Sequence, residues 1–286
     1  MAANFWTSSH CEGSKQLLDQ KDVDKVPQAD SDRGITPEEF RLVKIHMSFH
    51  IWRLAQQVKV RQRLNLLSTF WPGDSYCCYL FQACIHKWNI KLLEFCSDAG
   101  YVYRKSMTEY DPRLVAPTCL YLASKVEEST VQARLLVFYI KKMCASDEKY
   151  RFEIKDILEM EMKLLEALDY YLVVYHPYRP LLQLLQDAGI TDLTQFAWGI
   201  VNDTYKMDLI LIHPPYMIAL ACIYIASVLK DKDITLWFEE LRVDMNIVKN
   251  ISMEILDFYD TYKIDPQRGL PEDKIAPVMN KLPSKA

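Results

Sequence analysis

The sequence predicts an all-α fold built from two tandem repeats of about five helices each, preceded by an N-terminal segment. The first observation is a helical stretch that occurs twice, as DPRLVAPTCLYLASKVEE from Asp111 and as PPYMIALACIYIASV from Pro214. A shift of 215 − 112 = 103 residues places Pro112 on Pro215, and such duplication is typical of two copies of one domain. The second observation is that apolar residues recur at steps of three and four, and no segment alternates as a strand does.

The composition excludes several classes of protein. Half of the 286 residues are apolar, which is enough for a sizeable core. Lys and Arg total 34 against 38 Asp and Glu, so the formal charge is −4, which argues against a broad nucleic-acid surface. No apolar run approaches eighteen residues and the N-terminus does not resemble a signal peptide, so no membrane span is expected. The eight cysteines are therefore expected as thiols in a reducing compartment.

No motif indicates a catalytic, cofactor or metal site, and we expect a protein that is not an enzyme. The seven glycines form no nucleotide-binding fingerprint, and HExxH and GxSxG are absent. The cysteines between residues 64 and 102 fit no standard zinc spacing and lack paired histidines. His176 and His213 precede prolines and are interpreted as turn residues, and Cys119 and Cys222 as packing residues.

The first elements are an N-terminal segment, 1–35, and a long helix. The N-terminal segment is polar apart from Phe5 and Trp6, which either anchor a short helix on an apolar partner or fold back on their own core. Thr36-Pro37-Glu38-Glu39 is a capping box that begins an amphipathic helix of about 22 residues. This helix opens the first repeat, which we assign to residues 36–173.

The remaining helices follow the same periodicity. In the first repeat, Asp111 caps the duplicated helix, and further helices are expected over 131–143 and 153–171. In the second repeat, residues 174–263, a short helix is expected over 181–188 and ends before Gly189. The others are expected over 195–211, 215–230, around 237–241 and from 247 to 262. The tail, 264–286, contains four prolines and mixed charge and is predicted to be disordered.

Lys125 and Glu161 are the two charged residues that the helical pattern marks. Lys125 shares a helix face with Tyr121, and its duplicate is the apolar Val228. Glu161 lies seven residues from Ile154 on an apolar stripe, where charged residues are rarely buried without a partner. In one interpretation the two side chains snorkel at the edge of the core or pair with each other. In the other, both lie at the rim of an apolar patch that receives a partner. Glu127 and Glu128 form either a solvated helix end or an acidic pair facing a partner.

Long segments of the chain resemble the cyclins. The stretch LVAPTCLYLASKVEES, followed by a helix ending ILEMEMKLLEALDYYL, is similar to the first box of a cyclin. The resemblance narrows to the C-type cyclins of plants through three further segments: ANFWTSSH, VYHPYRPLLQLLQDAG and AWGIVNDTYKMDLILIHPPYMIALAC. It covers residues 1–63 and 103 to about 265, and it implies that the two repeats are tandem cyclin boxes.

The resemblance implies a nuclear regulatory subunit without cofactors. Cyclins bind a cyclin-dependent serine/threonine kinase and push its mobile C-helix into the active position. C-type cyclins join the kinase and the other subunits of the Mediator kinase module, which regulates RNA polymerase II transcription. The positions that match the family's kinase-binding residues are Lys125 and Glu161. Phe5 and Trp6 match the extra N-terminal helix laid on the kinase, and Glu128, with Glu127, would face the activation loop.

Residues 64–102 depart from the family pattern. About 38 unrelated residues stand where the second helix of the first box belongs, and the resemblance resumes at Tyr103. We hypothesise a retained intron or a mispredicted exon junction, which peptides spanning this stretch would test. Three alternatives remain for function. One is a TFIIB-like DNA-binding factor with the same fold, and another is an isoform whose disrupted first box does not activate a kinase. A plain helical scaffold that binds no kinase is a third.

Overall fold

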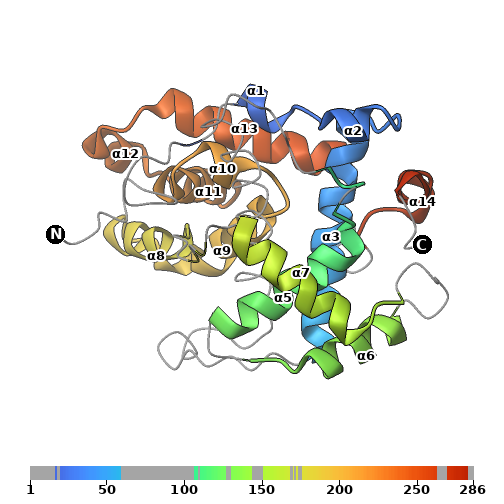
Figure 1. The fold of residues 1–286 in the computed structure, drawn as a ribbon. Helices are drawn as coiled ribbons and strands as arrows, with labels where there is room; N and C mark the ends of the chain where they lie inside the picture. Colours follow the sequence, from blue (N-terminus) through green and yellow to red (C-terminus); the bar gives the residue numbers. More distant parts are fainter. Residues whose placement is uncertain are drawn as a thin grey trace. The chain divides into compact units, whose positions relative to one another are not determined.

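The computed structural model describes residues 17, 20–58, 106–108, 110–126, 130–143, 151–167, 170, 172, 176–262 and 269–282 (Figure 1). Regular structure in these residues is helical, without strands, which confirms the all-α prediction. The chain divides into an N-repeat unit, residues 24–172 with 265–286, and a C-repeat unit, residues 1–23 with 173–264. The atypical stretch 64–102 lies outside the described residues.

The helices of each unit follow the chain in order. Those of the N-repeat unit are α2 (Gln28–Ser31), α3 (Pro37–Val58), α5 (Pro112–Val126), α6 (Ala133–Met143), α7 (Ile154–Ala167) and α14 (Glu272–Lys281). Those of the C-repeat unit are α1 (Gln20–Val23), α8 (Tyr178–Asp187), the 3-10 helix η2 (Thr191–Leu193), α9 (Thr194–Thr204), α10 (Leu209–Ile212), α11 (Pro215–Leu229), α12 (Thr235–Leu241) and α13 (Met245–Tyr262).

Helix α3 begins with the predicted capping box. The backbone N–H of Glu39 donates to Thr36 Oγ1 at 3.2 Å, and the backbone N–H of Thr36 donates to Glu39 Oε2 at 3.0 Å. These reciprocal bonds satisfy two donors that have no partner inside the helix. The helix runs for 22 residues, as its apolar periodicity predicts.

Helix α5 is the centre of the N-repeat unit. Asp111 caps it by accepting the backbone N–H of Arg113 at 2.9 Å, which confirms the predicted start. From Pro112 to Ser124 every residue except Leu114 is buried, because α3, α6 and α7 pack around the helix. A helix enclosed in this way needs small residues at its contacts, and Ala116, Ala123 and Ser124 supply them.

Helix α11 repeats this arrangement in the C-repeat unit, with α8, α9 and α13 packed against it. Both central helices have 15 residues, and their bounds differ by the predicted 103 positions. They share a detail: Ser124 Oγ donates to the carbonyl of Tyr121 at 2.7 Å, and Ser227 Oγ to that of Tyr224 at 2.8 Å. The two units are therefore two copies of one helical arrangement.

Two predicted boundaries in the second repeat are wrong. Helix α8 starts at Tyr178 and includes Pro180, which is tolerated there because N–H groups of the first helical turn have no helical partner. The single helix predicted over 195–211 is interrupted between Thr204 and Leu209. The break turns a dense apolar run inward, so that Tyr205, Met207 and residues 209–211 are all buried.

The predicted disordered tail, 264–286, contains a helix. Helix α14 lies against α3, although the two are far apart in sequence (Figure 1). Ile275, Val278 and Leu282 are buried in the core of the N-repeat unit, at spacings of three and four residues. Gly269 precedes them with φ +78°, and a side chain there would meet the ring of Phe49 at 3.0 Å. Burial of these apolar groups outweighs the prolines and charges that suggested disorder.

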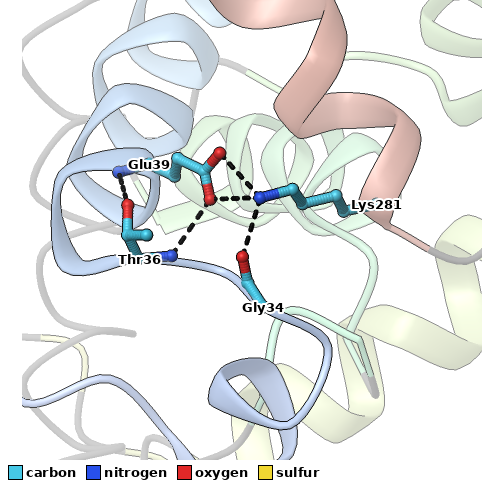
Figure 2. A network of polar contacts seen from close by, with 4 residues as sticks. All are labelled: Gly34, Thr36, Glu39 and Lys281. Carbon is cyan, nitrogen blue, oxygen red and sulfur yellow. Dashed lines mark hydrogen bonds and ion pairs between the residues drawn. The ribbon is translucent and has the colours of Figure 1, made fainter.

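Lys281 joins the end of α14 to the capping box of α3 (Figure 2). Its Nζ donates to both carboxylate oxygens of Glu39 at 2.7 Å and to the carbonyl of Gly34 at 2.7 Å. Partial burial raises the pKa of Glu39, but the hydrogen bonds from Lys281 and Thr36 outweigh it, and the pKa is lowered overall. The ionised carboxylate thus serves both the start of α3 and the end of α14.

Replacing Lys281 with methionine should loosen α14 without unfolding the N-repeat unit. At pH 7 we expect a loss of about 0.5–1 kcal/mol in the free energy of unfolding, since the pair is partly exposed to solvent. Faster amide hydrogen exchange in residues 269–282 would report the loosening directly.

The control is Lys274→Met, an exposed lysine of the same helix. Because the folded-state pKa of Glu39 is depressed, the stabilisation holds above its ordinary value of 4.5 and is lost as the pH falls through the depressed value. The difference in free energy of unfolding between Lys281→Met and the parent chain should therefore vanish at a pH below that depressed value. If amide exchange in residues 269–282 is equally fast in Lys281→Met and in Lys274→Met at pH 7, this role for Lys281 is contradicted.

Candidate functional site

Lys125 and Glu161 form an ion pair between two packed helices of the N-repeat unit. Lys125 lies in the last turn of α5, where that helix emerges from the core, and Glu161 lies in the middle of α7. Lys125 Nζ donates to Glu161 Oε1 at 2.7 Å and to Oε2 at 2.9 Å. The pairing that the sequence left open as one alternative is therefore present.

The two partners differ in their exposure to solvent. The side chain of Lys125 is 40% exposed, whereas that of Glu161 is 8% exposed. Lys125 Nζ also lies 4.3 Å from the ring centroid of Tyr121, within cation–π range. Partial burial lowers the pKa of Lys125, but the interactions with Glu161 and Tyr121 outweigh it, and the pKa is raised overall. Lys125 is thus held as a cation beside an almost buried carboxylate.

An exposed apolar stripe runs along α7 beside this pair. Ile154, Leu158 and Met162 follow at four-residue steps and are 37%, 41% and 53% exposed. We predicted one apolar stripe on this helix, but it carries two faces: Ile157, Met160 and Leu164 point into the core instead. By the 3.6-residue period, Glu161 falls between the buried face and the exposed stripe. The sequence pattern did not single out Met162, since periodicity alone does not distinguish a core face from an exposed one.

The pair retains hydrogen-bonding capacity for a partner. An ammonium group has three donors, and Lys125 directs two of them to Glu161 and also interacts with Tyr121. A carboxylate offers about four acceptor sites, of which Lys125 occupies two. The edge of the stripe can therefore offer a carboxylate acceptor beside a charged ammonium group, which suits the polar backbone groups at the end of a helix.

The other predicted partner-binding residues lie outside the described part of the chain. These are Phe5 and Trp6 in the N-terminal segment, and Glu127 and Glu128 directly after α5. Their roles stay predictions. Of the predicted site residues, the structure brings together Lys125 and Glu161.

The residues considered as ligands have ordinary packing roles where they are described. His176 Nδ1 and the hydroxyl of Tyr205 share a hydrogen bond of 2.8 Å within the C-repeat unit. Cys119 and Cys222 are buried thiols, and burial raises the pKa of Cys222. Among the described residues, no cluster of three or more His, Cys, Asp or Glu side chains is placed to hold a metal ion. None of the helices described is both long and apolar enough to cross a membrane.

Comparison with known proteins identifies the family. Residues 99–173 match the family model described as "Cyclin, N-terminal domain". Cyclin-C1-1 of Oryza sativa subsp. japonica is 85% identical over 286 residues, covering 100% of both chains. The chain belongs to the C-type cyclins. Cyclin-C1-1 of Arabidopsis thaliana is 56% identical to this cyclin over 99% of the chain and 98% of that protein. Cyclin-C of Rattus norvegicus is 37% identical over 99% and 91%.

Solved structures share the fold of this cyclin at low sequence identity. A chain of the yeast RNA Pol II CTD kinase CTDK-1 complex aligns with a TM-score of 0.62 at 18% identity, covering 98% of this chain and 87% of that one. A chain of the CAK complex from Chaetomium thermophilum aligns with a TM-score of 0.61 at 15% identity, covering 92% and 82%. At these identities the likeness establishes the fold.

The comparisons also bear on the atypical stretch of this cyclin. The family-model match begins at residue 99, close to Tyr103, where the resemblance to the family resumes. The rice cyclin aligns over its full length and that of this chain, so residues 64–102 add no length relative to it. Relative to the rice cyclin, the stretch is therefore not an added domain.

The unequal burial of the ion pair predicts unequal costs of removing its two members. Lys125→Met leaves an almost buried carboxylate without its cation, and should lower the free energy of unfolding by about 1–2 kcal/mol. Glu161→Gln leaves an ammonium group that water can reach, and should cost less than about 1 kcal/mol. Urea denaturation of the full chain measures both values.

A surface pair of the same helix provides the control. Lys155 and Glu159 lie 3.5 Å apart and are largely exposed, so Lys155→Met should cost under about 0.5 kcal/mol. If Lys125→Met and Lys155→Met lose equal stability, leaving the almost buried Glu161 unpaired costs no more than breaking a surface pair, and the prediction is wrong.

Proposed function

We propose that this cyclin binds and activates a cyclin-dependent serine/threonine kinase through the Lys125–Glu161 pair and the apolar stripe of α7. The observation that carries the proposal is the position of the pair at the border of Ile154, Leu158 and Met162. Contiguous exposed apolar side chains on a folded protein are typical of interaction sites. Family membership supplies the class of partner.

The geometry suits a partner helix. An amphipathic helix that covers Leu158 and Met162 would bring the unsatisfied backbone groups at one of its ends to the pair. Lys125 would donate to a backbone carbonyl, and Glu161 would accept a backbone N–H. In a cyclin-dependent kinase this helix is the C-helix, whose position sets the catalytic Lys–Glu pair and the magnesium-binding loop. The cyclin supplies no reacting group and acts by shifting the kinase towards its active conformation.

We infer the Mediator kinase module as the setting for this activity. C-type cyclins join its kinase and the other subunits of the module, which regulates transcription by RNA polymerase II in the nucleus. Two similar folds come from complexes whose names support a transcriptional kinase: the yeast RNA Pol II CTD kinase complex and the yeast TFIIK complex. A role in direct DNA binding is disfavoured by the formal charge of −4.

The second candidate is an isoform that binds no kinase because residues 64–102 replace the second helix of its first box. The pair and the exposed stripe lie on α5 and α7, and neither helix belongs to the replaced segment. We therefore favour the binding-competent isoform, and the following experiment separates the two.

Co-purification with the cyclin-dependent kinase of the Mediator kinase module tests the proposal. The full chain should retain the kinase. The double variant Lys125→Ala with Glu161→Ala, and separately Leu158→Asp in the stripe, should each weaken binding by about tenfold or more, since buried polar pairs and apolar anchors dominate interfaces. Phosphorylation of a peptide substrate by the assembled kinase should fall in parallel.

The matched control removes another ion pair of the same charge type. Lys232 and Asp192 lie 3.1 Å apart on the surface of the C-repeat unit, and their double alanine variant should bind as the parent chain does. Failure of the parent chain itself to bind, with both units folded by limited proteolysis, would favour the isoform that binds no kinase.

A further inference from the structure

Helix α6 presents an outward surface that the proposed kinase contact does not use. Leu136, Val137 and Ile140 form its buried face, within the core of the N-repeat unit. The opposite face carries two exposed apolar residues, Leu135 and Phe138, which are 40% and 59% exposed. Three exposed cations surround them. We name this set, Arg134, Leu135, Phe138, Lys141 and Lys142, the α6 face.

The spacing gathers these side chains around Phe138. Arg134 lies four residues before it and Lys142 four residues after it, while Leu135 and Lys141 lie three residues away on either side. Side chains three and four apart on a helix are neighbours, so the five form one patch. The ring of Phe138 thus lies at the centre of the patch, with Arg134 on its N-terminal side and Lys141 and Lys142 on its C-terminal side.

No described residue neutralises the α6 face. Helix α6 contains no acidic residue, and Arg134, Lys141 and Lys142 form no ion pair with the part of the chain that the structure describes. Lys142 Nζ lies 5.9 Å from the ring centroid of Tyr139 on its own helix. The patch therefore carries three positive charges in a chain whose formal charge is −4.

Helix stability does not account for this composition. Lys141 and Lys142 lie in the last turn, where the helix dipole favours cations. Arg134 is the second residue of the helix, where the same dipole disfavours a cation. Phe138 gains nothing from exposure, because its ring would be stabilised by burial. Phe138 makes an edge contact with Tyr139 at 5.3 Å between ring centroids but stays 59% exposed, so neither Arg134 nor Phe138 is required by the core of the unit.

We propose that the α6 face is a docking site for an acidic amphipathic segment of a protein partner other than the kinase. Apolar side chains of that segment cover Phe138 and Leu135, and its carboxylates pair with Arg134 and the two lysines. Eleven residues of helix span about 16 Å, which matches roughly three turns of a bound helix. A contact of this size is weak by itself, as is typical of transient recruitment.

The charge pattern separates this face from the surface of α7. There, the cation of Lys125 is already paired with Glu161 and the stripe is apolar, so the surface selects by shape. Single-stranded nucleic acid also binds aromatic and basic residues. Three cations on one helix and an exposed leucine favour an acidic peptide over a phosphate backbone.

The test uses a fluorescein-labelled 15-residue peptide with leucine or phenylalanine at positions of one helical face and glutamate or aspartate elsewhere. Fluorescence anisotropy with the full chain should show binding that weakens as NaCl rises from about 50 to 300 mM. Phe138→Ser, and separately Lys141→Glu with Lys142→Glu, should each raise the Kd by about tenfold or more. A peptide of the same pattern with lysine in place of the acidic residues should not bind.

Matched controls come from elsewhere on the chain. Leu236→Ser removes an apolar side chain of α12 that is 77% exposed, and Lys249→Glu with Lys274→Glu reverses two exposed charges. Both should change the Kd less than about twofold. Equal weakening by the controls, no binding by the parent chain, or tighter binding of a 15-nucleotide oligothymidine at the same face would overturn the proposal.

Kinase co-purification provides the remaining readout. The α6 variants should retain the kinase as the parent chain does, because their side chains are exposed and the Lys125–Glu161 pair is intact. Loss of the kinase in folded α6 variants would place this face within the kinase contact and overturn its assignment to a second partner.

Discussion

The rest of each unit depends on a central helix that is enclosed by its neighbours along almost its whole length. Residues 112–124 are buried except Leu114, and residues 215–227 are buried except Tyr216 and Tyr224. A helix with no solvent face cannot change one side chain without disturbing a neighbour, because interiors are close-packed. This constraint explains why the duplication can still be recognised from the sequence of the central helix. It also explains why Ser124 and Ser227 make the same hydrogen bond to the backbone.

The same constraint determines where the two units can differ. Each central helix reaches solvent in its last turn, and there the repeats diverge: Lys125 in α5 corresponds to the exposed Val228 in α11. Lys125 pairs with the almost buried Glu161 of α7 and keeps 40% of its own side chain exposed. A residue at this position can acquire a binding role at little cost to the core, so the two copies share a fold while one of them carries the polar pair.

The sequence predicted those features that depend on local rules. The capping box of Thr36 and Glu39, the cap at Asp111 and the central helices all follow from residue types at fixed spacing. Features that depend on distant partners escaped prediction. Helix α14 is stabilised by the core contacts of Ile275 and Val278 and by Lys281 at the start of α3, none of which its own composition reveals. For the site, periodicity marked Lys125 and Glu161, but the division of α7 into a buried and an exposed apolar face becomes visible once α5 is packed against it.

The two surfaces of the N-repeat unit differ in how they respond to salt. Beside the α7 stripe, the cation of Lys125 is neutralised by Glu161 within the chain, so association there depends mainly on apolar burial and on hydrogen bonds that form in a dry interface. On α6, the three cations gain from a partner's charge, and that gain is screened over a Debye length of about 8 Å at physiological ionic strength. A partner held through α7 therefore persists when salt displaces one held through α6. Under the two proposals, the N-repeat unit would keep its kinase at salt concentrations that release an acidic partner from the α6 face.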